Sequence, residues 1–205
     1  DYLSLEQAAR ELYIGTQTLR TWVRSHKEYS SLSLPIGNRI MPYFSSSDIE
    51  HIRTDKHLKI HNDETLLQDF EDFIDENTLT FSFKLVFILS MFKLADKEGE
   101  VRLDALVEEY KQFYLNRIAR KLPVDKANCA YTADYLNNDT KIKKSLLDNP
   151  FEKFERKRFV MYSKDLNIVE FNPTIWSQMN QDYKNRIILK EQHFLEEYYQ
   201  DKGGL

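Results

Sequence analysis

The sequence predicts a mainly α-helical protein that carries two small β-hairpins, and three observations lead to this prediction. The 205 residues include five glycines and five prolines, so few positions interrupt a helix. Hydrophobic residues make up 41% of the chain, and in several segments they recur at the three- and four-residue spacing of an amphipathic helix. Two other segments alternate apolar and polar residues around short turns, as β-hairpins do.

The segment from Ser4 to Ser25 predicts two short helices joined by a tight turn. Ser4 and Gln7 have the spacing of a capping box, in which each side chain accepts a hydrogen bond from the backbone N–H of the other residue. Gly15 is expected to form the turn at positive φ, and Thr16 to cap the second helix.

The second helix is expected to bury one face and expose a polar one. Leu19, Trp22 and Val23 share the apolar face, so Trp22 is expected in the domain core. On the other face, Gln and Arg side chains can hydrogen-bond base edges, and Arg can also hold phosphates. A helix presented in this way can enter the major groove of DNA. The residues expected to contact DNA from this segment are Thr16, Gln17, Thr18, Arg20, Thr21, Arg24 and Lys27.

A β-hairpin is predicted next. Leu32–Ile36 and Arg39–Phe44 are rich in strand-forming residues and flank Gly37-Asn38, a two-residue hairpin turn. Two prolines restrict these strands to short or edge positions. Arg39, beside the turn, is expected to contact the DNA backbone or the minor groove.

A third helix is predicted after the hairpin, because Ser47 and Glu50 have the spacing of a second capping box. Helix, turn, helix, hairpin and helix make a compact winged helix-turn-helix unit, expected over residues 1–56. Its motifs are the paired alanines Ala8-Ala9, TLRTW from Thr18 to Trp22, IGNR from Ile36 to Arg39 and SSSDIE from Ser45 to Glu50. With these motifs in this order, the segment resembles the excisionase and MerR-like DNA-binding families. The resemblance implies DNA binding, although this hairpin offers chiefly Arg39 where those families often carry more basic residues.

The charge distribution agrees with a local DNA-binding patch. The formal net charge of −4 excludes a uniformly basic surface. Between Ile14 and Tyr43, however, four basic residues stand against Glu28 alone, and such a patch is what phosphate contact requires. Because the patch is modest, we expect a homodimer or a larger protein assembly on double-stranded DNA.

Residues 57–79 are expected to form a linker and an acidic helix, and residues 80–205 a larger helical domain. The apolar residues from Glu64 to Asp75 recur at helical spacing, and the opposite, acidic face is expected to be solvated or, alternatively, to mimic DNA or dock a basic partner. Phe81–Leu94 predicts a buried helix; it is too short to span a bilayer, so no membrane contact is expected. Further helices are predicted over Leu103–Ala119 and Tyr183–Tyr199.

A second wing-like hairpin is predicted near residues 159–171, after a helix over Asp139–Leu147. Basic residues cluster in this region, and they form either a second phosphate-contacting surface or an ordinary solvated face with ion pairs. The candidates are Lys141, Lys143, Lys144, Arg156, Lys157 and Arg158.

The sequences FSFKLVFILSMFKLADKEGEV and NPFEKFERKRFVMYSKDLNIVEFNPTIW carry a second resemblance. Between Thr80 and Met179, the chain is similar to C-terminal regions of some bacterial helicase-type and restriction-associated defence proteins. This resemblance implies a bacterial or phage setting. No Gly-rich loop ending in Lys-Ser/Thr is present, so no nucleotide-binding loop of that kind is expected.

No catalytic residue, cofactor or metal site is expected. His57 and His61 are four residues apart, but only Asp63 offers a third ligand nearby. Glu155 and Lys157 form a Glu-x-Lys tripeptide like that of one nuclease class, without an evident strand-borne Asp. The single cysteine is compatible with a reducing cytoplasm, which is the expected location.

The sequence therefore predicts a sequence-specific double-stranded DNA-binding protein that is not an enzyme, either a bacterial or phage transcription regulator or a recombination accessory factor. Two alternatives remain open at this point. One is a DNA-recognition or scaffold module of a larger defence or restriction assembly, and the other is a nuclease.

Overall fold

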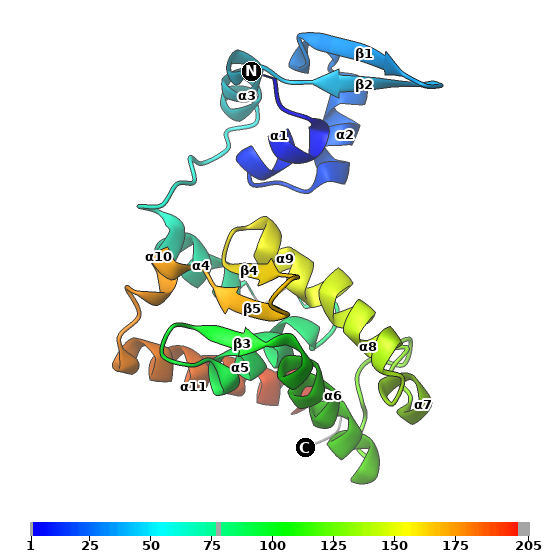
Figure 1. Ribbon diagram of the computed structural model, residues 1–205, viewed down its shortest axis with the longest axis vertical. Helices are drawn as coiled ribbons and strands as arrows, with labels where there is room; N and C mark the ends of the chain where they lie inside the picture. The colour runs from blue at the N-terminus through cyan, green and yellow to red at the C-terminus, as the bar shows by residue number, and fades with distance from the viewer. Residues whose placement is uncertain (1, 77–78, 201–205) are drawn as a thin grey trace. The chain divides into compact units, whose positions relative to one another are not determined.

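The structure of the chain, a computed structural model, describes residues 2–76 and 79–200 (Figure 1). It is mostly helical with two small antiparallel sheets. The chain divides into two compact units, unit 1 (Asp1–Thr65) and unit 2 (Leu66–Leu205). The boundary falls within the segment expected as linker and acidic helix, and the acidic helix belongs to unit 2.

Unit 1 contains its elements in the predicted order, from blue to cyan in Figure 1. They are α1 (Leu5–Glu11), α2 (Thr16–Ser25), the 3₁₀ turn η1 (Lys27–Tyr29), β1 (Leu32–Ile36), β2 (Arg39–Tyr43) and α3 (Ser46–Asp55). One hydrophobic cluster joins all of the helices, and an isolated bridge between Leu3 and Phe44 ties the start of the chain to the end of the hairpin. The buried members are Leu5, Ala8, Ala9, Leu12, Leu19, Tyr29, Phe44, Ile49 and Ile52.

The turn between α1 and α2 differs from the prediction. Gly15 has φ −70° and serves as the N-cap of α2, and Thr16 is the first helical residue rather than the cap. The positive φ belongs to Tyr13 (61°). Tyr13 and Ile14 donate backbone hydrogen bonds to Arg10 and Ala9, which is the pattern of a Schellman motif. The hydrogen bonds of this motif, with Ile14 against the core, hold a non-glycine residue in the left-handed region.

Capping boxes begin both α1 and α3, but only the first pairs the predicted residues. The Ser4–Gln7 box is confirmed, with both reciprocal hydrogen bonds present. The second box, however, pairs Ser45 with Asp48 and not Ser47 with Glu50. Asp48 has a further reason to occupy this place, because it also accepts hydrogen bonds from the backbone N–H and the hydroxyl of Ser31. The box thereby links α3 to the chain that enters the hairpin.

The first hairpin has the predicted register. Ile36 pairs with Arg39 across the turn, and Gly37 adopts φ 59°, which a two-residue hairpin turn requires at this position. Pro42 lies opposite Ser33, and Pro35 opposite Ile40.

Unit 2 packs its elements around α5, whose residues are buried over most of its length. The elements are α4 (Leu66–Asp75), α5 (Phe83–Leu94), β3 (Glu100–Arg102), α6 (Leu103–Ala119), α7 (Ala133–Leu136), α8 (Asp139–Leu146), η2 (Leu147–Phe151), α9 (Glu152–Arg156), β4 (Val160–Ser163), β5 (Ile168–Phe171), α10 (Pro173–Trp176) and α11 (Gln181–Gln200). In the part of the chain that the structure describes, no helix is long and apolar enough to cross a membrane.

The second hairpin is part of a three-stranded sheet rather than a free-standing wing. β4 and β5 form the predicted hairpin, but β5 also pairs with β3, so the order is β3-β5-β4. Val169 and Phe171 of the central strand are fully buried. β3 was not predicted, because three residues are too few to show the alternation of apolar and polar side chains that is typical of a strand.

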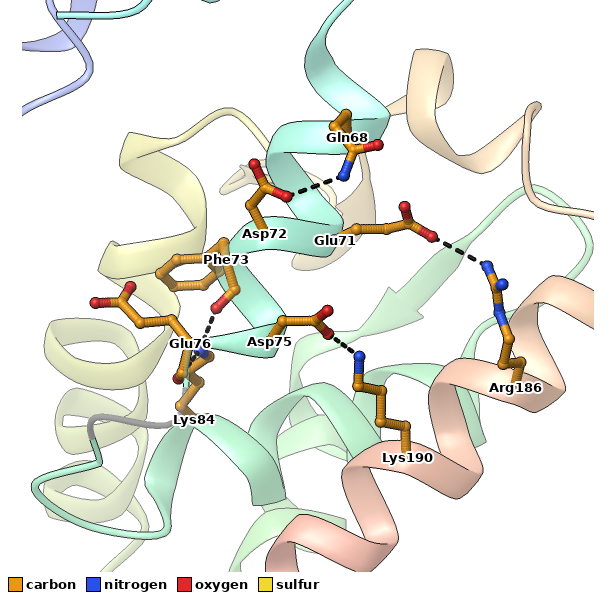
Figure 2. Close-up of polar contacts among 9 residues, drawn as sticks. All are labelled: Gln68, Glu71, Asp72, Phe73, Asp75, Glu76, Lys84, Arg186 and Lys190. Carbon is orange, nitrogen blue, oxygen red and sulfur yellow. Dashed lines mark hydrogen bonds and ion pairs between the residues drawn. The ribbon is translucent and has the colours of Figure 1, made fainter.

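The acidic face of α4 is partly engaged by two basic side chains of another helix in the same unit. Glu71 accepts a hydrogen bond from Arg186 at 3.0 Å, and Asp75 accepts one from Lys190, both on α11 (Figure 2). These two carboxylates remain partly exposed, so the expectation of a solvated face is incomplete rather than wrong, because it left out their ion pairs. The partners Arg186 and Lys190 both lie on α11, 115 residues further along the chain, so the pairing could not be predicted from local sequence.

Candidate nucleic-acid interface

The polar face of α2 is presented to solvent as predicted. Leu19 is fully buried and holds the helix on the core. Gln17, Thr18, Arg20, Thr21 and Arg24 are exposed, and Thr16 is half-buried. Ten residues of α-helix span about 15 Å, a length that a DNA major groove of about 12 Å width can accommodate along its course.

Hydrogen bonds along α2 order part of this face. Arg20 Nη1 donates to Gln17 Oε1 at 2.9 Å, and the Thr21 hydroxyl donates to the Gln17 backbone carbonyl at 3.0 Å. Because Arg20 occupies the Gln17 side-chain oxygen, the Gln17 amide group keeps its two N–H donors. The pair thus presents donors from both residues.

A cavity lies between α2 and the hairpin, which we call the α2–hairpin cavity. Its volume is about 760 Å³. Arg20, Arg24, Lys27 and Arg39 all line it, so the structure brings together the four basic residues predicted from separate elements. Thr16, Gln17, Thr18 and Thr21 are not among its lining residues. The remaining lining residues are Leu5, Val23, Ser30, Ser33, Ile40, Met41 and Pro42.

No carboxylate of the described residues lines the α2–hairpin cavity. Glu28, the acidic residue of this segment, lies 3.1 Å from the ring of His26, Oε1 to Nδ1. A hydrogen bond from its own backbone, followed by the one with His26, lowers the pKa of Glu28. Among the described residues, the lining therefore combines four cationic side chains with mainly apolar ones and contains no opposing charge.

Trp22 sits at the edge of the core instead of inside it. It is half-buried, and the ammonium of Lys56 lies 5.6 Å from its ring centre and 5.3 Å from that of Tyr29. Lys56 also pairs with Asp55 at 2.9 Å. The sequence did not single out Lys56, because its contacts with Trp22 and Tyr29 form only when the end of α3 packs near α2. Ser33 and Ile40 were not predicted either, because only the packing of the hairpin places them at the cavity.

The six residues of the possible second basic surface fall into two groups. Lys141, Lys143 and Lys144 belong to α8, where Lys144 forms an ion pair with Asp148. Arg156 and Lys157, at the end of α9, line a different cavity that includes none of the α8 lysines and not Arg158. Arg158 is exposed at the following turn with φ 66°.

The residues considered for a metal or nuclease site have other surroundings. His61 stacks on Tyr13 with ring centres 3.9 Å apart, and His57 is exposed at the end of α3. Asp148, the aspartate that precedes Glu155 and Lys157 in the sequence, is paired with Lys144. Across residues 2–76 and 79–200, no group of three or more His, Cys, Asp or Glu side chains could hold a metal ion.

Comparison of the chain with protein-family models, with curated proteins and with solved structures finds no match in any of the three.

Proposed function

We propose that unit 1 is a winged helix-turn-helix module that binds double-stranded DNA in a sequence-specific manner, with α2 in the major groove and the hairpin on the adjacent backbone. The observation that carries the proposal is the α2–hairpin cavity, where Arg20, Arg24, Lys27 and Arg39 meet and no carboxylate of the described chain joins the lining. A concave surface of one charge sign attracts a polyanion, and side chains that point into it suit phosphate oxygens.

The two parts of the α2 face have different roles in this proposal. Arg24, Lys27 and Arg39 line the cavity and contact phosphates. Gln17, Thr18 and Thr21 lie on the exposed face outside it and read base edges. Arg20 belongs to both parts, because it lines the cavity and is hydrogen-bonded to Gln17.

The number of cations limits the affinity of one copy. Four phosphate contacts correspond to a slope of about −3.6 in a plot of log affinity against log salt, using about −0.9 per contact. A single module of this kind binds weakly at physiological salt, so two copies or a protein partner complete the DNA-binding surface. The cellular role is that of a transcription regulator or recombination accessory factor in a bacterium or phage.

A specific feature favours the alternative of a recognition module in a larger assembly. Ile36 and Ile40, beside the hairpin turn, are 53% and 75% exposed. Apolar side chains of this size at an exposed tip suit contact with another protein as well as with DNA sugars. In that role unit 1 positions a defence or restriction partner on DNA.

DNA selection from a random pool with the full chain tests the proposal. Enrichment of one motif is expected, and the spacing of its half-sites reports the number of copies bound. Arg20→Ala with Arg24→Ala should weaken binding by about tenfold or more and reduce the salt slope by about 2. The matched control is Arg102→Ala with Arg120→Ala, which removes two exposed arginines from unit 2. Unchanged affinity and salt slope in the α2 variant would refute the proposal.

A further inference from the structure

Unit 2 contains a second positively charged cavity, which we call the α9 cavity. It has a volume of about 220 Å³ and lies where the end of α4, the start of α5 and the α9 region meet. Among the described residues, four cationic side chains line it, Lys84, Lys153, Arg156 and Lys157, against the single carboxylate of Glu76. The other lining residues are Phe73, Leu79, Thr80, Phe81, Phe83 and Asn149.

Three of these cations come from one helical face. Lys153, Arg156 and Lys157 have the i, i+3, i+4 spacing that places side chains side by side on a helix. Arg156 also lies 3.5 Å from Glu152, a distance that leaves its guanidinium with further donors. Like charges held together in this way repel one another, and an anion between them relieves that repulsion.

Lys84 is fixed in place by the backbone. Its side chain is almost fully buried, and its ammonium donates to the carbonyl oxygens of Phe73 and Glu76, which Figure 2 shows. Its ammonium also lies 4.3 Å from the Phe73 ring centre. The contacts hold the charge at the cavity wall without neutralising it, since neither a carbonyl group nor an aromatic ring carries a formal charge.

Burial is the main cause of the lowered pKa values of two cavity lysines. Burial lowers the pKa of Lys84 to about 8, although Glu191, Glu76 and Asp75 act in the opposite direction. Burial, followed by the charge of Arg156, lowers the pKa of Lys157 against the effect of Glu76 and Asp69.

We propose that the α9 cavity binds a phosphoryl group through Lys153, Arg156, Lys157 and Lys84, with the Asn149 amide as an additional donor. The cavity is smaller than the range of about 300–1,000 Å³ that is usual for whole small-molecule ligands, so it admits the charged end of a ligand. Arginine and lysine together provide the bidentate and point-charge contacts that phosphate oxygens accept. This site is independent of the DNA contacts proposed for unit 1.

Titration of the full chain, observed in ¹H–¹⁵N NMR spectra, tests the site. The probes are inorganic phosphate, a 5′-phosphorylated thymidine dinucleotide and the same dinucleotide without its phosphate, each compared with chloride at equal ionic strength. Saturable shifts of residues 149–157 are expected with the first two probes. If the phosphorylated dinucleotide binds roughly tenfold more tightly than inorganic phosphate, the natural ligand is the phosphorylated end of a nucleic acid. If the two bind equally, the ligand is free phosphate.

Two charge-matched variants separate specific binding from general attraction. Lys153→Gln with Arg156→Gln should weaken phosphate binding by roughly tenfold, whereas Lys141→Gln with Lys144→Gln, which lies outside the cavity, should leave it unchanged. Amide spectra of both variants report whether unit 2 remains folded. The proposal is overturned if neither phosphate-bearing probe gives a saturable shift beyond chloride, or if both variants lose affinity equally.

Discussion

Replacing Glu191 by Gln should stabilise unit 2 at neutral and higher pH. Glu191 lies on α11 and is fully buried, and neither of its carboxylate oxygens has a hydrogen-bond partner in the described part of the chain. Burial, with a smaller contribution from Asp75, raises its pKa from the usual 4.5 to about 7, although Lys84 and Lys190 act to lower it. Glutamine has nearly the same shape and carries no charge at any pH.

The magnitude follows from the two pKa values. The folded state keeps the Glu191 proton up to about pH 7, but the unfolded state releases it near 4.5. Protonation thus contributes stability that is fully present below the unfolded pKa and is lost as pH rises through the folded one. A shift of about 2.5 units at 1.36 kcal/mol each corresponds to about 3 kcal/mol. Glu191→Gln should match the parent near pH 4.5 and exceed its free energy of unfolding by up to about 3 kcal/mol near pH 8.

Urea unfolding between about pH 4.5 and 8 measures this difference. A Trp22→Phe background leaves Trp176 as the fluorescent reporter of unit 2. Glu196→Gln, on the exposed side of the same helix, is the matched control and should not alter the pH profile. Parallel stability profiles for Glu191→Gln and the parent would refute the reasoning, as would a less stable variant near pH 8.

Two further predictions concern turns and caps. Gly99→Ala should destabilise unit 2 by about 2 kcal/mol or more and perturb Trp176 fluorescence, because Gly99 has φ +87° and a Cβ there would lie 2.8 Å from the Trp176 ring. Gly37 also has a positive φ, +59°, but a Cβ there would meet no atom within 4 Å. Gly37→Ala should therefore lower the free energy of unfolding of unit 1 by less, as measured by thermal unfolding. Asp48→Ala should destabilise unit 1 by about 2 kcal/mol, because Asp48 completes the capping box of α3 by accepting a hydrogen bond from the Ser45 backbone N–H, and it accepts two more from Ser31. Burial acts to raise the pKa of Asp48, but hydrogen bonds from Ser31 and Ser45 outweigh it, so the pKa in the folded state is lowered. The ionised carboxylate therefore stabilises the parent protein, and this stability should be lost as pH falls through the folded-state pKa of Asp48. The Asp48→Ala variant should not show this loss.

Local signals in the sequence were sufficient for many elements of the fold. The Ser4–Gln7 box, the Gly37-Asn38 turn and the bounds of α6 depend on neighbours within a few residues, and all are present as predicted. The left-handed residue after α1 was misassigned because glycine is the usual choice, whereas here the hydrogen bonds of the whole motif stabilise Tyr13.

Contacts between distant segments could not be read in this way. β3 reaches β5 across more than sixty residues, and α4 finds its basic partner on α11. The exposed face of α2 was predictable from helical period, but its combination with Arg39 in one cavity depends on the packing of the hairpin. The same holds for Lys84, which a helical pattern places in an apolar core and the structure places at a cavity wall.

The two prolines of the first hairpin restrict how another chain can join it. In the observed register, Pro35 and Pro42 occupy positions whose N–H would point away from the partner strand. Leu3 already bridges to Phe44 just beyond the end of β2. The outward donors within the two strands are therefore reduced to Ser33 on one edge and Ile40 on the other, too few for the continuous ladder that strand addition needs. Neither edge of this hairpin therefore favours the addition of a further strand, and what the hairpin exposes beside its turn is the apolar side chains of Ile36 and Ile40.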